Sequence, residues 1–237
     1  MSTNNLPPTP HENAVDQIIP FLWIRRGIGI LGIIFPFIMA LGNYFLFDCH
    51  HLLPAISDYF HTKMMTLFVA ILSMIAIFLW TYRGPKGEDK HWATLAAVLC
   101  LGVALFPNNV KEVVKQCNGF DTYTLDTLHQ ICAIGMFLVL AYFCLFIFVK
   151  TNPDEVQTSN QVTLKKKRNI IYKICGYGIL AAMFAMAILI KIDTDKSIQA
   201  QFSYIFWGES ICLIAFGTSW ITKGDWFIFG DGKSSNN

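Results

Sequence analysis

Apolar residues fill six long stretches of the chain almost without interruption, and polar segments separate them. The stretches cover about 27–47, 64–82, 92–109, 128–149, 170–190 and 202–222. Most reach or approach the ~20 residues that an α-helix needs to cross roughly 30 Å of hydrocarbon. The pattern predicts an all-α fold, a polytopic membrane bundle of six transmembrane helices. The third stretch is the shortest, and it would also fit a buried or re-entrant segment unless Asn108 and Asn109 extend it.

Composition supports this fold class. Hydrophobic residues make up 54% of the 237 residues and charged residues only 14%, where a soluble domain carries about 25% charged residues. We expect a mobile polar tail at 1–23, a membrane domain at 24–224 and a second tail at 225–237. The first tail lacks the pattern of a removable secretory signal, so the first helix would act as an uncleaved insertion signal. GIGILG, residues 27–32, favours close packing between helices and permits self-association.

Positive charge indicates the orientation. Lys and Arg in short loops are held on the cytoplasmic side of a membrane. With the amino terminus inside, thirteen of the eighteen basic residues fall on inner segments and five on outer ones. Both termini are therefore predicted to be cytoplasmic, and a bacterial inner (plasma) membrane is the expected location. The basic run LKKKRN, residues 164–169, is interpreted as a topology determinant, and no nucleic-acid partner is expected.

The seven cysteines divide into two groups. Five lie within predicted spans and are expected to behave as small apolar residues: Cys100, Cys132, Cys144, Cys175 and Cys212. Cys49 and Cys117 lie instead in the first and second external loops. If that side of the membrane is oxidising, a bond between them would clamp the first two helices to the next two. The sequence leaves open whether the two sulfurs approach within bonding geometry.

A short polar run precedes the second apolar stretch. Ser57, Asp58 and His61 lie at or just before the predicted start of that helix. If the helix begins near Ser57, then Ser57 and His61, four residues apart, share one face. The alternative is that Ser57 or Asp58 is a helix N-cap, with its oxygen accepting amide protons of the first turn. Capping does not account for His61.

Further polar residues are predicted at similar depth in other helices. His129 lies near the start of the fourth stretch, and Asn43 lies near the outer end of the first. Glu209 is the only charged residue in the middle of a predicted span. Such a carboxylate faces the bundle interior by default and marks a functional site, although a protonated glutamic acid that only bonds two helices together is an equal alternative. The predicted ligand pocket comprises Asn43, Ser57, Asp58, His61, His129 and Glu209.

SDYFH, residues 57–61, resembles the metal-binding Ser-x-x-x-His element of the CREST-group membrane hydrolases, which include the alkaline ceramidases and adiponectin receptors. The resemblance implies zinc held by histidines, including His61, and a bound water that attacks a lipid amide. Two features depart from that group. Its last helix carries a pair of histidines four apart, whereas the last helix here has Glu209 and no histidine, and this chain has six predicted spans rather than seven.

PAISDYF, residues 54–60, precedes an apolar helix in a chain with six predicted spans and an inner amino terminus. In this it resembles the DRAM and Frag-type membrane proteins and their uncharacterised bacterial relatives. The resemblance implies an integral membrane protein tied to lipid handling or membrane homeostasis, without an established catalytic motif.

Two functions follow as hypotheses. The first is a cofactor-free membrane protein whose outward-facing pocket binds, senses or transports a lipid or a small polar-headed molecule. The alternative is a metal-dependent lipid hydrolase in which His61, His129 and a carboxylate, Glu209 or Asp58, hold zinc or act as a general base. A proton or ion pathway would rest on Glu209 alone. Whether the chain is an enzyme stays open, membrane lipids are the expected partners, and a homo-oligomer is compatible with the sequence.

Overall fold

A computed structural model describes residues 10–47, 49–82, 89–116, 119–120, 123–150 and 159–224, and these residues form helices and connecting segments without a β-strand. The elements in chain order are α1 (Pro10–Leu46), η1 (Ile56–His61), α2 (Met65–Thr81), α3 (Asp89–Leu105), α4 (Glu112–Gln116), α5 (Asp126–Tyr142), η2 (Phe143–Ile147), α6 (Ser159–Ile192), α7 (Ser197–Phe202) and α8 (Tyr204–Lys223). The element η1 is a 3₁₀-helix, and η2 is a turn of π-helix that continues α5.

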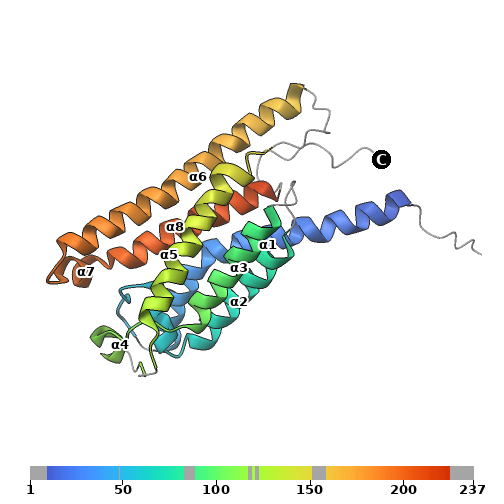
Figure 1. Ribbon diagram of the computed structural model, residues 1–237. Coiled ribbons are helices and arrows are strands. Elements are labelled where there is room, and N and C mark those ends of the chain that lie inside the picture. The colour runs from blue at the N-terminus through green and yellow to red at the C-terminus, as the bar shows by residue number, and fades with distance from the viewer. Residues whose placement is uncertain are drawn as a thin grey trace, which may run out of the picture.

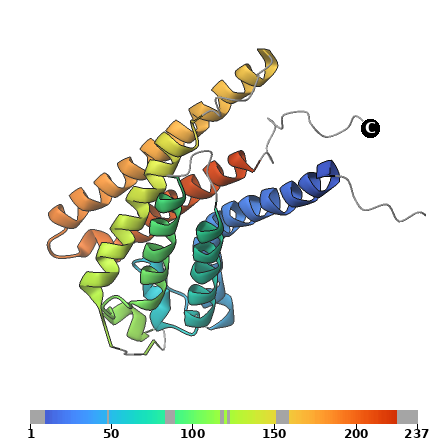
Figure 2. The same cartoon turned by 45° about the vertical axis from the view of Figure 1, so that its right-hand side comes forward.

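The six long helices form a closed ring. Going around it, α1 packs against α2, α2 against α3, α3 against α5, α5 against α6, α6 against α8, and α8 against α1. Figures 1 and 2 show these helices running side by side, with the short α4 and α7 at one end of the bundle. We call this end the α4–α7 end. The short helix η1 contacts α1, α2, α4 and α8, so it closes the interior of the ring near that end.

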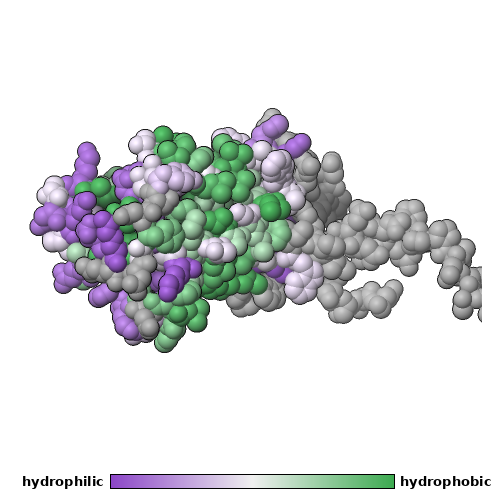
Figure 3. All heavy atoms as spheres, turned by 90° about the horizontal axis from the view of Figure 1, so that it is seen from below, coloured by the Kyte–Doolittle hydropathy of each residue, from purple (hydrophilic) through white to green (hydrophobic). Residues whose placement is uncertain are grey.

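Four helical segments are long and apolar enough to cross a membrane: Arg25–Leu46, Asp126–Ile147, Val162–Ile192 and Tyr204–Lys223. The surface agrees, because hydrophobic residues form a broad band over the middle of the molecule while hydrophilic residues gather at the α4–α7 end (Figure 3). The chain is thus an all-helical protein with the features of a membrane-embedded one. Helices α2 and α3 have 17 residues each, so the count of six spans stays a prediction.

Helices α1 and α8 approach each other at glycines. A Cβ atom built on Gly29 would lie 2.7 Å from the carbonyl oxygen of Gly217 and 2.9 Å from the backbone nitrogen of Ile221. A Cβ atom on Gly32 would lie 3.4 Å from the carbonyl oxygen of Leu213. At Gly29 the backbones are too close for a side chain, and at Gly32 a Cβ atom would be in tight contact, 3.3 Å from a side-chain carbon of Phe216. The prediction that GIGILG supports close helix packing is confirmed, and its partner is α8 of the same chain.

The helix ends differ from the predicted spans where polar residues continue the helix. Helix α1 begins at Pro10, inside the segment predicted as a tail, and α6 begins at Ser159 rather than near residue 170. Lys, Arg and Gln are good helix formers, so the LKKKRN run extends α6 instead of ending it.

At the same end of the bundle, Arg26 Nε donates to the carbonyl oxygen of Gly224 over 2.8 Å. The first and last helices are therefore tied together at that end.

The cysteines follow the predicted division as far as the structure describes them. Cys100, Cys132, Cys144, Cys175 and Cys212 are buried free thiols. Cys49 is disulfide-bonded. Cys117, its predicted partner, lies outside the described residues, so the identity of the pair stays a prediction.

Candidate functional site

The segment before α2 turns back into the bundle. Residues 56–61 form η1, in which every residue is buried, and α2 begins only at Met65. The expectation that Ser57 and His61 share a face of the second helix is therefore wrong, because these residues belong to a separate 3₁₀-helix. The hydrogen bonds of Pro54 and of the buried polar side chains hold this segment as a 3₁₀-helix, a structure that α-helical periodicity does not predict.

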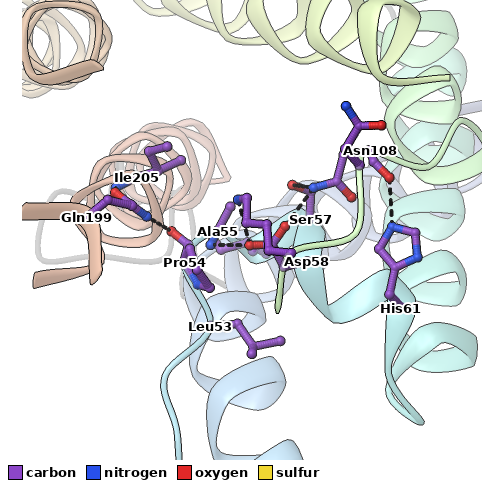
Figure 4. A network of polar contacts seen from close by, with 12 residues as sticks. Leu53, Pro54, Ala55, Ser57, Asp58, His61, Asn108, Gln199 and Ile205 are labelled. Atoms are coloured by element: carbon purple, nitrogen blue, oxygen red, sulfur yellow. Dashed lines mark hydrogen bonds and ion pairs between the residues drawn. The ribbon is translucent and has the colours of Figure 1, made fainter. Parts of the chain in front are cut away.

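Helix α8 and the segment before it anchor η1 from one side. The carbonyl oxygen of Pro54 accepts hydrogen bonds from Gln199 Nε2 over 2.7 Å and from the backbone nitrogen of Phe206 over 2.9 Å (Figure 4). The backbone nitrogen of Ile56 donates to Glu209 Oε2 over 2.7 Å. Glu209 thus points into the bundle, as predicted for a carboxylate within a span. One of its oxygens accepts a hydrogen bond from a backbone N–H group of the first turn of η1, a group that helices otherwise leave unpaired.

Asp58 is the most heavily bonded side chain of η1. Its side chain is fully buried, and Oδ2 accepts from the backbone nitrogen of Ala55 over 2.9 Å and from Lys111 Nζ over 2.8 Å. Its other oxygen, Oδ1, accepts from Asn108 Nδ2 over 2.7 Å. The bond to Ala55 is the carboxylate half of a capping box, three residues into the helix. The N-cap of η1 is Ala55 and that of α2 is Met64, so the prediction that Ser57 or Asp58 is the N-cap is wrong. Asp58 bonds to the N-cap residue instead, and the same carboxylate links η1 to the segment after α3.

That segment, 106–109, is held by both histidines of the predicted pocket. His61 Nε2 donates to the carbonyl oxygen of Asn108 over 2.8 Å (Figure 4), and His129 Nδ1 donates to the carbonyl oxygen of Phe106 over 2.7 Å. A carbonyl oxygen only accepts, so these two ring nitrogens carry protons. The side chain of Asn108 completes the set, because its Nδ2 donates to Ser57 Oγ over 3.2 Å as well as to Asp58.

Replacing Asn108 with alanine is expected to lower the free energy of unfolding by about 1–3 kcal/mol, because Asp58 loses a buried hydrogen-bond donor. Asn109→Ala is the matched control: Asn109 is exposed, and only its backbone nitrogen bonds, to Asp126 Oδ1. The control should change stability by less than about 0.5 kcal/mol. Unfolding in mixed micelles titrated with sodium dodecyl sulfate measures both values. Equal stability of the two variants would contradict the role given to Asn108.

A cavity lies beneath η1, inside the ring. Residues of α1, α2, α3, α5, α8 and η1 line it, with phenylalanines 35, 68 and 137 among its apolar walls. Its polar lining comes from Ser57, His129 and Glu209. The space for the centres of water-sized molecules is about 30 Å³, where one water needs roughly 10–15 Å³ by that measure. The cavity therefore holds a few water-sized groups.

The three polar groups of the cavity keep hydrogen-bonding capacity that the described residues do not use. Glu209 accepts at Oε2, and its Oε1 has no hydrogen bond to a described residue. His129 is 4% exposed, and with a proton on Nδ1 the neutral ring presents an unprotonated Nε2. Ser57 Oγ accepts one bond, from Asn108, which leaves a lone pair and its proton. Buried polar groups normally have hydrogen-bond partners in the protein or in ordered water, and these three groups leave that capacity open toward the cavity.

The other predicted pocket residues lie elsewhere. Asp58 and His61 are buried in the contacts above the cavity and do not line it. Asn43 is 1% exposed, does not line the cavity, and neither atom of its side-chain amide has a hydrogen-bond partner among the described residues.

Burial raises the pKa of Tyr59 in η1 to about 12. Its phenol therefore stays uncharged, and its oxygen accepts a long hydrogen bond from the backbone nitrogen of Leu53.

These positions do not fit the zinc centre of the alternative hypothesis. The described residues contain no group of three or more His, Cys, Asp or Glu side chains that could hold a metal ion. His61 Nε2 donates to a carbonyl oxygen, which leaves the lone pair of the neutral ring on Nδ1, a buried atom with no hydrogen-bond partner among the described residues. His129 and Glu209 line the cavity without His61. Zinc binding and hydrolysis stay untested predictions.

Comparison with known proteins adds no family. The chain matches no family model, no curated protein and no solved structure. The resemblances to DRAM and Frag-type proteins and to CREST-group hydrolases therefore stay predictions that rest on a few residues around Ser57. Function has to be inferred from the site itself.

Sequence reasoning missed three residues that shape the site: Asn108, Lys111 and Gln199. Asn108 was noted only as a possible end of the third helix. Its position directly after Pro107 could have indicated this role, because a proline disfavours helix at the residue before it. The helix is therefore expected to end there, and Asn108 then lies outside it. Lys111 lies in the segment before α4 and Gln199 lies in the short helix α7, and the sequence carries no sign of their distant partners.

Proposed function

We propose that this protein is a multi-pass membrane protein of six spans that binds the polar end of a lipid or of a small polar-headed molecule in the cavity beneath η1. The observation that carries the proposal is the set of unused hydrogen-bonding atoms on Ser57, His129 and Glu209 around one largely apolar space. Pockets for small ligands combine apolar walls with a few convergent polar groups in this way.

The proposed topology places both termini in the cytoplasm of a bacterial cell and the α4–α7 end outside. Helices α2 and α3, with 17 residues, lie at the lower end of the roughly 17–25 residues that span a bilayer. The link between Arg26 and Gly224 supports termini on one side. With this orientation the cavity lies in the outer half of the membrane, and the bonded Cys49 faces an oxidising compartment.

Lipid retention tests the proposal. The protein is reconstituted with phosphatidylethanolamine, phosphatidylglycerol, phosphatidylcholine and diacylglycerol, returned to detergent, and weighed by native mass spectrometry. We expect one lipid-sized adduct on the wild type, and a reduction by about tenfold in Glu209→Gln, because a hydrogen bond to a charged group is lost. Glutamine still offers an oxygen to the backbone nitrogen of Ile56, so the fold is kept.

Glu112→Gln is the matched control, because the Glu112 side chain is 83% exposed on α4 and far from the cavity lining. It should retain the wild-type adduct. A wild type without an adduct, or a Glu209→Gln variant that retains as much lipid as the control, would contradict lipid binding at this site.

A further inference from the structure

The chemistry of the cavity narrows the group that it takes, on the assumption that it is the binding site proposed above. Its polar atoms are mostly acceptors. Glu209 Oε1 and Ser57 Oγ have free lone pairs, and His129 Nε2 has one in the neutral ring. Three acceptors around one small space match the three N–H donors of a primary ammonium group.

Charge points the same way. Within the part of the chain that the structure describes, Glu209 is the only acidic residue that lines the cavity, and no Lys or Arg lines it. Lys111 is a cation of the contacts around η1, and its ammonium group bonds to Asp58 and not to Glu209. A carboxylate surrounded by apolar walls is costly unless it takes up a proton or a cation pairs with it, and a bound ammonium group would be such a cation. Phenylalanines 35, 68 and 137 in the lining suit a cation as well, because aromatic faces attract positive charge.

The size of the cavity also limits which ligand groups it can hold. A space of about 30 Å³ for water-sized centres accommodates an NH₃⁺ group and one or two attached carbons. A quaternary ammonium such as tetramethylammonium is bulkier and has no N–H to donate. We propose that the cavity binds a primary ammonium group, either of a free alkylamine or of an ethanolamine lipid headgroup, with Glu209, His129 and Ser57 as its acceptors.

Thermal unfolding of the purified full-length protein tests this inference. The probes are ethylammonium chloride, tetramethylammonium chloride and sodium chloride at equal ionic strength, up to about 50 mM, because a ligand of three heavy atoms binds no tighter than about 1 mM. Ethylammonium is expected to raise the unfolding midpoint in a saturable way, and the other two salts are not. Equal responses to all three salts, or no response to ethylammonium, would overturn the proposal.

Two variants locate the effect. Glu209→Gln removes the charge and is expected to weaken ethylammonium binding by about tenfold or more, while Glu112→Gln keeps the wild-type response. Ala133→Ile adds bulk to the cavity wall from α5 and replaces none of its three polar side chains, and it should abolish the response even if Glu209→Gln folds poorly. Retention of the full response in both Glu209→Gln and Ala133→Ile would overturn the assignment to this cavity.

Nanodiscs separate the two sources of the ammonium group. If an ethanolamine headgroup occupies the cavity, discs of phosphatidylethanolamine suppress the ethylammonium response, and discs of phosphatidylglycerol preserve it. If a free amine is the ligand, the response is the same in both. Glu209-dependent lipid retention without any preference for primary amines would leave the proposed function intact and overturn the ammonium inference alone.

Discussion

Replacing Asp58 with alanine is expected to lower the free energy of unfolding by about 2–4 kcal/mol. The carboxylate is fully buried and accepts from the backbone nitrogen of Ala55, from Asn108 Nδ2 and from Lys111 Nζ. Its removal leaves the backbone nitrogen of Ala55 buried without a partner and takes one of two acceptors from Asn108 Nδ2, while Lys111, 38% exposed, turns to solvent. Titration with sodium dodecyl sulfate in mixed micelles measures the loss.

A double-mutant cycle checks this account. Lys111→Met should destabilise the wild type, because it leaves a buried carboxylate without its cation, and should have little effect in the Asp58→Ala background. Glu112→Ala serves as the surface control, because its ion pair with Lys115 is exposed and such pairs contribute about 0–1 kcal/mol. An Asp58→Ala variant as stable as Glu112→Ala would show that η1 is held by other contacts.

Alanine at Gly29 or Gly217 is expected to destabilise the bundle by about 2–3 kcal/mol or more, at the upper end of the cost of overpacking. The new methyl group on Gly29 would meet the backbone oxygen of Gly217, and that on Gly217 would meet the backbone oxygen of Gly29. Backbone atoms cannot turn aside, so α1 and α8 would have to separate. The same unfolding titration measures the cost.

Gly178 in α6 provides the control, because a Cβ atom there has no other atom within 4 Å. Gly178→Ala should leave stability unchanged or raise it by up to about 1 kcal/mol, since alanine is the better helix former. If Gly29→Ala and Gly178→Ala behaved alike, the close approach of α1 and α8 would be wrong.

Much of the helical framework could be predicted from the sequence, because an apolar run long enough to cross a bilayer has to satisfy its backbone hydrogen bonds within one helix. The fourth predicted span, 128–149, closely matches Asp126–Ile147. The interior position of Glu209 followed from the cost of a carboxylate in hydrocarbon. Boundaries were harder, since polar helix formers before residue 170 continue α6 without an apolar signal.

The candidate site could be predicted only in part. Ser57, His129 and Glu209 line one cavity, and the sequence placed them at similar depth because each lies toward the same end of its predicted helix. Asp58 and His61 come from the same short segment but turn to other partners. That division depends on the 3₁₀ path of η1, which carries no periodic signal of its own.

By itself, the sequence determined that the chain folds into long apolar helices, the glycine face of α1 and the inward direction of Glu209. These features depend on the chemistry of neighbouring residues along one helix. The tertiary structure alone decided that Glu209 accepts a hydrogen bond from the backbone nitrogen of Ile56, 153 residues away, and that Asn108 joins η1 to the end of α3. Hydrogen bonds between distant segments depend on where folding brings their ends together, and no local pattern records that position.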